Sequence, residues 1–252
     1  MRLDKNVKVS RYTFGDDRSA LDRLLLVSEA YEPVSRTFLT TRAPRQGRVA
    51  LDLGCGPGFS TQLLKEICRP EILLGVDSSA VFVQSARARL PGVRFETHDV
   101  TVNPLPGAPA DLIYSRLLLA HLADPLAVAR DWASQLRPGG ALLIEDLEGV
   151  IDPPGPLREY ESVSEQIVRS GGGLMYAGAV LADLGGDAQR VTVPGGLAAR
   201  IYLFNVRRWR QTPNLPVSEG HLGELEAGLV EMAANDGGTD VSWIVRQLVM
   251  TA

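Results

Sequence analysis

Cysteine, histidine and long apolar runs are all scarce in this sequence. Its 252 residues include two cysteines and three histidines, too few for a disulfide framework or a cysteine-rich metal cluster. No apolar stretch reaches the roughly 20 residues needed to span a bilayer, and the N-terminus lacks the apolar core of a signal peptide. We therefore expect a cytoplasmic protein without a metal site or a membrane partner.

An excess of positive charge is also absent. Lysine and arginine number 26 against 30 aspartates and glutamates, which gives a formal net charge of -4. Because nucleic-acid binding depends mainly on a basic surface, this balance disfavours a nucleic-acid partner. The hydrophobic content of 45% is normal for a globular protein with a substantial core. The length is compatible with one large domain.

The chain is organised around the stretch RVALDLGCGPGFSTQL, residues 48–63. The short apolar run at 49–53 is typical of a strand buried on both faces in a parallel sheet. Gly54, Gly56 and Gly58 follow at alternate positions, and the residues after them suit the start of a helix. A ligand can therefore lie against bare backbone at the N-terminus of this helix.

The spacing of the glycines distinguishes a dinucleotide-binding turn from another kind of cofactor-binding turn. A dinucleotide fingerprint needs glycine or alanine where this sequence has Phe59. The order found here, with Asp52 two places before three alternating glycines, resembles motif I of the class I S-adenosylmethionine-dependent methyltransferases, whose consensus is close to DxGxGxG. The resemblance implies S-adenosyl-L-methionine as the cofactor, with a carboxylate near the turn helping to hold its ammonium. The binding residues implied by this motif are Asp52, Gly54, Cys55, Gly56 and Gly58.

Two further strand ends are expected to face the same crevice, because ligands of open parallel sheets lie outside the carboxyl ends of the strands. Asp77 ends the second expected strand, and the resemblance implies that it binds the ribose hydroxyls, with Ser78 beside it. After the third strand, the resemblance assigns the adenine amine to Asp99 and an apolar wall or backbone contact to Val100. Asp77 alone is equally compatible with an NAD enzyme.

The segment DLIYSRLLLAHLADP, residues 111–125, resembles the fourth strand and following helix of small-molecule methyltransferases. The resemblance implies that Ser115 and Arg116 lie at the mouth of the pocket, where the main chain contacts the methionine part of the cofactor. His121 is expected on the helix among leucines. It is a candidate general base, although a histidine in such a run is more often bonded to backbone.

Two segments are candidate lids. Helices are expected at 16–30 and 33–41, with Tyr12 and Tyr31 either folding over the pocket or filling the core. Helices are also expected at 157–170 and 177–184, in an insertion that would cover the acceptor. The candidate acceptor contacts in this insertion are Tyr160, Glu161, Glu165, Met175 and Tyr176.

The carboxylates Glu145 and Asp146 follow a fifth expected strand at 141–144. They could bind an ammonium or a metal, but acids at a strand end are usually solvated or capping.

These elements predict an α/β fold with a Rossmann-like, doubly wound sheet. Family resemblance implies seven mostly parallel strands, the last one, 240–249, entering antiparallel between strands five and six. We expect a single domain with four parts: an N-terminal helical lid at 1–46, a cofactor-binding core at 47–148, a helical insertion over the acceptor site at 149–186, and the C-terminal part of the sheet at 187–252.

The function expected from the resemblance is methyl transfer to O, N or C of a small molecule, in specialised metabolism. The expected partners are this acceptor and, as an option, a second copy of the chain in a homodimer. Three alternatives stay open: an NAD-dependent oxidoreductase, a methyltransferase fold that uses the cofactor non-catalytically as a cyclase or binding module, and methylation of a protein or RNA.

Overall fold

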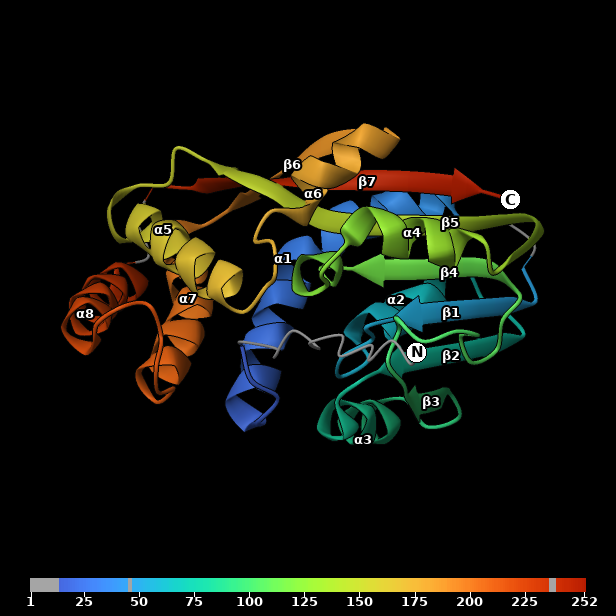
Figure 1. Ribbon diagram of the computed structural model, residues 1–252, viewed down its shortest axis with the longest axis horizontal. Coiled ribbons are helices and arrows are strands. Elements are labelled where there is room, and N and C mark those ends of the chain that lie inside the picture. Colours follow the sequence, from blue (N-terminus) through green and yellow to red (C-terminus); the bar gives the residue numbers. More distant parts are fainter. Residues whose placement is uncertain (1–13, 45–46, 236–238) are drawn as a thin grey trace, which may run out of the picture.

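One seven-stranded sheet forms the centre of the computed structural model, which describes residues 14–44, 47–235 and 239–252. The strand order is β3-β2-β1-β4-β5-β7-β6 (Figure 1). The first five strands are parallel, and β7 lies antiparallel between β5 and β6. The expected doubly wound sheet and the place of its last strand are thus confirmed. The strands are β1 Val49–Leu53, β2 Ile72–Asp77, β3 Arg94–Thr97, β4 Ala110–Arg116, β5 Leu136–Ile151, β6 Asp187–Val193 and β7 Val241–Thr251.

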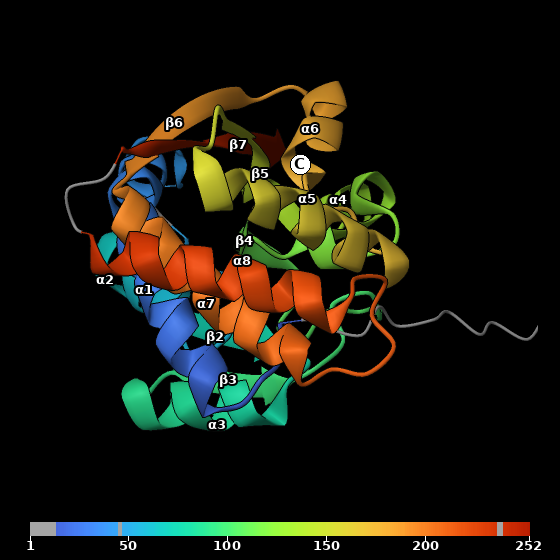
Figure 2. The ribbon, with the colours of Figure 1, turned by 90° about the vertical axis from the view of Figure 1, so that its left-hand side faces the viewer.

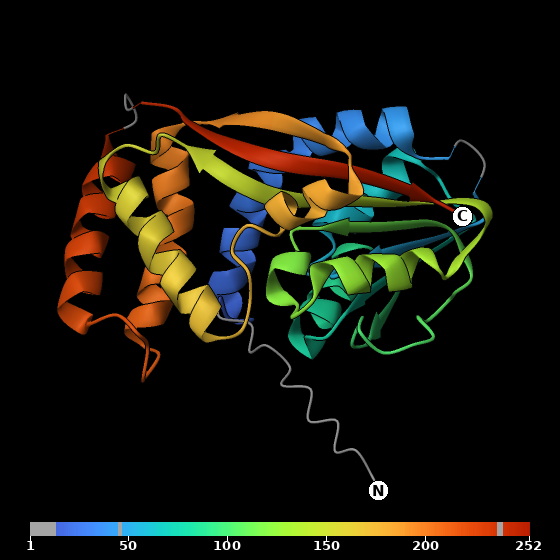
Figure 3. The same ribbon diagram turned by 45° about the horizontal axis from the view of Figure 1, so that its top comes forward.

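Helices cover both faces of the sheet because side chains of successive strand residues point to opposite faces. Leu51 and Leu53 of β1 belong to a core that includes α4 and α6, whereas Ala50 packs with α1 and α2 on the other side. Figure 3 shows α4 and α6 on one face of the sheet. The helices are α1 Arg18–Arg42, α2 Phe59–Ile67, α3 Ala80–Arg89, α4 Pro125–Ala133, α5 Gly155–Ser170, α6 Ala177–Leu181, α7 Gly195–Arg210 and α8 Glu219–Ala234.

A helical layer lies beyond one end of the parallel strands. It consists of α5, α7 and α8, with the start of α1 between it and the sheet (Figures 1 and 2). These helices share one apolar cluster with α1, β6 and β7. The layer therefore closes the side of the sheet on which the parallel strands end.

The N-terminal segment differs from the sequence-based expectation. A single helix, α1, runs through Pro33 where two helices were expected. Proline removes one backbone hydrogen bond and usually breaks or kinks a helix. Here Tyr31, Phe38 and Leu39 are buried on both sides of Pro33, so packing against the rest of the molecule keeps the two halves continuous. Tyr12 lies outside the described residues.

Two corrections concern the region around the end of the sheet. The helix expected after β4 is only a 3-10 turn, Leu119–His121. Strand β5 continues to Ile151 because β7 pairs with it from Ala141 to that residue. Glu145 and Asp146 therefore lie inside a strand and are fully buried, and are not solvated groups at a strand end.

In the part of the chain that the structure describes, every helix is too short or too polar to cross a membrane.

Candidate active site

The glycine turn joins β1 to α2 in a conformation that favours glycine. Gly54, Gly56 and Gly58 all have positive φ angles, of 66°, 51° and 89°. A Cβ at Gly54 would lie 2.8 Å from the side chain of Leu118, whereas at Gly56 the nearest atom would be 3.9 Å away, on Leu24. The backbone at Gly56 is thus open to a ligand.

A cavity of 590 Å³ adjoins this turn, at the carboxyl ends of β1, β2 and β4. Its volume falls in the range of roughly 300–1,000 Å³ that is usual for small-molecule and cofactor sites. Most of the residues expected at the cofactor line it. These are Gly54, Cys55, Gly56, Asp77, Ser78, Asp99, Val100 and Arg116, and the candidate general base His121 lines it as well.

Four of the expected residues do not line this cavity: Asp52, Gly58, Ser115 and Tyr31. Gly58 faces α3, because a Cβ there would come within 3.2 Å of Ala86. Ser115 is fully buried in β4, and its hydroxyl oxygen has no hydrogen-bond partner among the described residues. Tyr31 belongs to a second cavity, described below.

Asp52 is fully buried beneath the glycine turn. Its Oδ2 accepts hydrogen bonds from Ser60 at 2.8 Å and Thr61 at 2.5 Å, so it anchors the start of α2. Its Oδ1 has no partner among the described residues. Burial raises the pKa of Asp52 to about 6. This unsatisfied oxygen is the group in the turn that a cationic ligand would stabilise.

Asp77 connects the turn to the second strand. Its Oδ2 accepts from the Gly56 backbone N–H at 2.9 Å, and its Oδ1 accepts from that of Ser79 at 2.8 Å. Burial raises the pKa of this carboxyl group. The Ser79 hydroxyl donates to Asp16 at 2.8 Å, which brings the segment before α1 to the edge of the cavity.

The third strand end supplies a second carboxylate and an apolar wall. Asp99 Oδ1 accepts from the backbone and the hydroxyl of Thr101, at 2.9 and 2.7 Å, and forms a tight turn. Val100 is held from behind because Trp132 Nε1 donates to its carbonyl oxygen at 2.9 Å. His98 also lines the cavity, with its Nε2 2.9 Å from the carbonyl oxygen of Val102.

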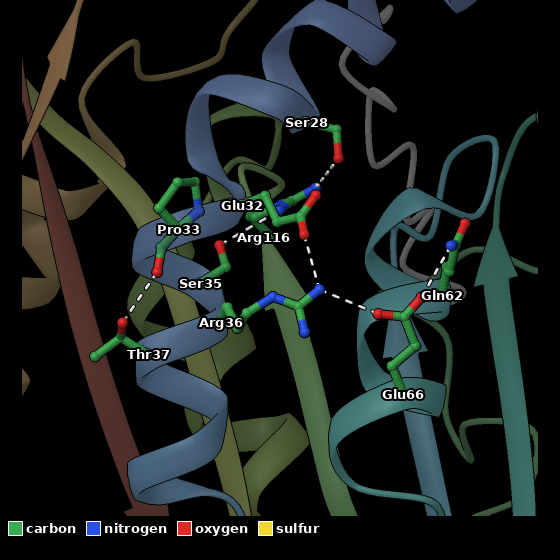
Figure 4. A network of polar contacts seen from close by, with 9 residues as sticks. All are labelled: Ser28, Glu32, Pro33, Ser35, Arg36, Thr37, Gln62, Glu66 and Arg116. Atoms are coloured by element: carbon green, nitrogen blue, oxygen red, sulfur yellow. Dashed lines mark hydrogen bonds and ion pairs between the residues drawn. The ribbon is translucent and has the colours of Figure 1, made fainter.

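Arg116, at the end of β4, fixes α1 over the site. Its guanidinium donates to the hydroxyls of Ser35 at 3.3 Å and Ser28 at 3.2 Å (Figure 4). In the same view Arg36 bridges Glu32 on α1 and Glu66 on α2. The exposed Arg36 pairs contribute little energy, so the half-buried Arg116 contacts are the firmer link between helix and sheet.

A second, smaller cavity of 140 Å³ lies next to the first. Both cavities are lined by Leu24, Val27, Leu117 and His121. The remaining wall comes from α1, α5, α7, β5 and β7 and includes Tyr31, Tyr160 and Met175. The insertion thus brings two of its five candidate residues, Tyr160 and Met175, to this cavity.

The other three candidates of the insertion are engaged elsewhere. Glu161 is buried and accepts hydrogen bonds from the hydroxyls of Tyr202 and Tyr176. Glu165 is partly exposed and pairs with Arg169. Glu161 and Tyr176 therefore support the wall from behind, without lining the cavity themselves.

His121 lies where the two cavities meet. Its ring makes an edge contact with Phe14, at 5.5 Å between centroids. Burial, aided by the positive charge of Arg23, lowers the pKa of His121 to about 4. The imidazole is therefore neutral at physiological pH. Within the described ranges, no three His, Cys, Asp or Glu side chains are grouped so that they could hold a metal ion.

The parallel sheet, the glycine turn after its first strand and the antiparallel seventh strand define a methyltransferase-type α/β fold. Residues 51–144 match the family model described as "Methyltransferase domain". The structure of YjhP from E. coli aligns with a TM-score of 0.51 and 19% identity, over 89% of this chain and 92% of that one. This likeness shows the fold.

Sequence relatives agree with the family match. An uncharacterized 37.1 kDa protein in transposon TN4556 of Streptomyces fradiae is 34% identical over 166 residues, covering 62% of this chain and 48% of that protein. The trans-aconitate 2-methyltransferase of Methylobacterium nodulans is 35% identical over 138 residues, 54% of this chain and 52% of the enzyme. The chain thus aligns with about half the length of each of these two relatives. Residues 51–144 thus carry a methyltransferase domain, within a sheet of the class I methyltransferase fold.

Proposed function

We propose that the chain transfers a methyl group from S-adenosylmethionine to a small-molecule acceptor. The observation that carries this proposal is the pair of adjoining cavities. One lies against the glycine turn, and the smaller one shares His121 and Leu117 with it. A cofactor cavity joined to an acceptor cavity is what direct transfer between two bound molecules requires.

The residues of the larger cavity fit this cofactor. The open backbone at Gly56 admits a ligand, and the Asp77 and Asp99 carboxylates are suited to hydroxyl and amine donors. Asp52 lies beneath the turn and outside the cavity lining, so in this proposal its unpartnered Oδ1 favours an ammonium group through an intervening water. In this proposal Ser78, Val100 and Arg116 complete the cofactor site, while Gly58 and Ser115 support it from within the fold.

The bound cofactor supplies an electrophilic methyl group on a sulfonium with a good leaving group. The chain then has to align the acceptor and exclude water. The start of α1, held by Arg116, and the 149–186 insertion provide the cover. His121 is placed to accept a hydrogen bond from an acceptor. Its pKa of about 4 makes it a weak base, so we assign it an orienting role rather than strong general-base catalysis.

The size of the second cavity favours a small acceptor over a protein or RNA. The names of the trans-aconitate 2-methyltransferases denote a tricarboxylate acceptor. In this chain the second cavity has a buried carboxylate, Asp146, in its wall, which disfavours an acidic acceptor. We therefore propose a different small molecule, methylated on O, N or C in specialised metabolism.

Titration calorimetry of the full chain with S-adenosylhomocysteine and with NAD+ tests the assignment. We expect saturable binding of S-adenosylhomocysteine and none of NAD+, because Phe59 occupies the position of the third fingerprint glycine. Binding of NAD+ alone would move the assignment to an oxidoreductase. Tight S-adenosylhomocysteine binding without methyl transfer to any acceptor would favour a cyclase or a binding module.

A further inference from the structure

The second cavity has an aromatic wall. Tyr31 stacks on Trp243 with ring centroids 5.4 Å apart, and Tyr202 lies against the same tryptophan at 6.2 Å. Tyr160 in turn stacks on Tyr202 at 3.6 Å. All four rings line the cavity. Tyr160 also stacks on Trp209 at 5.4 Å, so Tyr160, Tyr202 and Trp243 each have two stacked ring neighbours. Ring edges therefore remain for a ligand, and aromatic groups also pair edge to face.

One carboxylate in this wall is left incompletely bonded. Asp146 is fully buried, and its Oδ2 accepts from the Leu119 backbone N–H at 2.9 Å. Its Oδ1 has no hydrogen-bond partner among the described residues, although the side chain lines the cavity. A buried carboxylate oxygen without a donor is costly. This oxygen therefore indicates a donor on the ligand.

Neighbouring acids make this end of the cavity negative. Asp146, Glu161 and Glu145 all raise the pKa of Tyr31, and only Arg116 among its main charged neighbours opposes them. Glu161 already accepts from two tyrosine hydroxyls, and Glu145 accepts from Tyr114 at 2.5 Å and Gln247 at 2.7 Å. Asp146 is thus the one of these three acids with an oxygen left for a ligand.

The positive charge in the wall lies on the side of Phe14. The Arg23 guanidinium is 5.2 Å from the centre of the Phe14 ring, and its charge acts on His121. Asp146 instead acts on Tyr31. Arg23 and Asp146 thus both border the cavity, and Asp146 is the acid among its lining residues.

We propose that the second cavity recognises an aromatic amine-bearing acceptor, whose N–H group donates to Asp146 Oδ1 while its ring packs against the edges of the stacked tyrosine and tryptophan rings. This inference rests on the proposed methyltransferase function and specifies the substrate class. Asp146 acts in it as the residue that determines specificity between amines and acids.

The test compares three probes of similar shape by calorimetry at pH 8: phenethylamine, 2-phenylethanol and phenylacetate, each with saturating S-adenosylhomocysteine. We expect phenethylamine to bind the full chain at least tenfold more tightly than phenylacetate. Asp146→Asn keeps an oxygen for the Leu119 amide and removes the charge. It should weaken phenethylamine binding tenfold or more and leave 2-phenylethanol within threefold.

Asp111→Asn is the matched control, because Asp111 holds the backbone of Arg48 and Val49 near the start of β4, away from both cavities. It should leave the binding of all three probes unchanged. The inference is overturned if phenethylamine does not bind, if phenylacetate binds as tightly, or if Asp146→Asn has no effect. Binding of S-adenosylhomocysteine to each variant is measured separately, and a variant that binds it is folded. If the native chain does not bind S-adenosylhomocysteine, the proposed function fails, whereas a failure confined to the three probes counts against this inference.

Discussion

At the scale of single residues, Asp146 links acceptor recognition to stability. Burial raises its pKa to about 7, opposed by the backbone amides of Leu119, Leu147 and Leu118. The folded chain therefore holds this proton to a higher pH than the unfolded chain. Its contribution to the free energy of unfolding falls as the pH rises from about 4 to about 7, and is constant above that.

Asp146→Asn removes this dependence. Relative to the native chain, the variant should gain about 3 kcal/mol more stability at pH 8 than at pH 5, from two pH units at roughly 1.4 kcal/mol each. Urea denaturation at the two pH values measures the difference, with Asp111→Asn as control. An equal effect at both pH values would show that Asp146 is ionised throughout this range.

A second residue-scale prediction concerns Asp77, which we place at the cofactor. Asp77→Ala removes both a ligand acceptor and the bond to the Gly56 N–H. We expect at least a tenfold loss in S-adenosylhomocysteine affinity by calorimetry, about 1.4 kcal/mol or more. Glu224→Gln, on an exposed face of α8, is the control and should bind normally. Unchanged affinity in Asp77→Ala would remove Asp77 from the site.

Residues of the larger cavity could be predicted where a side chain suited to the cofactor directly follows an expected strand. Asp77 and Asp99 follow short apolar runs, and the carboxyl ends of parallel strands meet at one edge. The contact of Asp16 with Ser79 was missed, because it depends on how the segment before α1 packs in three dimensions. The burial of Asp146 was missed because no feature of the sequence around it shows that β5 continues alongside β7.

At the scale of elements, a variant of the glycine turn and a control glycine variant distinguish the loss of a ligand contact from backbone strain. Gly56→Ala places a methyl group at the open face of the turn and adds strain of roughly 1–2 kcal/mol from its positive φ. Gly92→Ala is the matched control, with φ of 88° and nothing within 4 Å of the added Cβ. Both variants should lose similar stability, but only Gly56→Ala should lose S-adenosylhomocysteine binding, by tenfold or more in calorimetry. Equal binding by the two variants would contradict the assigned contact.

Helix α1 allows a prediction of how much Pro33 lowers the free energy of unfolding. Pro33→Ala restores a backbone N–H in the middle of the helix and should raise the free energy of unfolding by about 1–3 kcal/mol. Chemical denaturation measures this gain. Thr37→Ala, one turn later on the exposed side, is the comparison, since it removes only a side-chain bond to the Pro33 carbonyl oxygen. A loss of stability in Pro33→Ala would indicate that the native helix depends on the shape of proline.

The elements that were predicted well have strong local signals. Strand β1 and helix α5 begin and end close to the expected residues, because apolar residues at strand or helix spacing and flanking turns define them. The turn at His121 was expected to be a helix because a run of leucines is equally compatible with both. Tertiary packing decides such cases, as it does for the continuity of α1 through Pro33.

At the scale of the whole molecule, the sheet and the helical layer meet at the two cavities. The sheet positions the cofactor residues, while α5, α7 and the start of α1 provide much of the second cavity. The order of strands and helices could be read from the sequence, but the packing of the helical layer against the sheet could not, because it depends on contacts between residues more than 100 positions apart, such as the stacking of Tyr31 on Trp243.

Because the cavities lie between these parts, ligand binding should stabilise the whole chain. A ligand at about 100 times its Kd that binds only the folded state adds about 2.7 kcal/mol. For a domain of about 150–250 residues this corresponds to a Tm increase of roughly 5–10 °C. We expect that increase with S-adenosylhomocysteine and none with NAD+, measured by differential scanning calorimetry. At the same ligand concentration Gly56→Ala should keep at most about half of the increase and Gly92→Ala should keep all of it, because both carry the backbone strain and only one lines the cavity. A shift with NAD+, or the same shift in both variants, would show that the ligand stabilises the chain from another place.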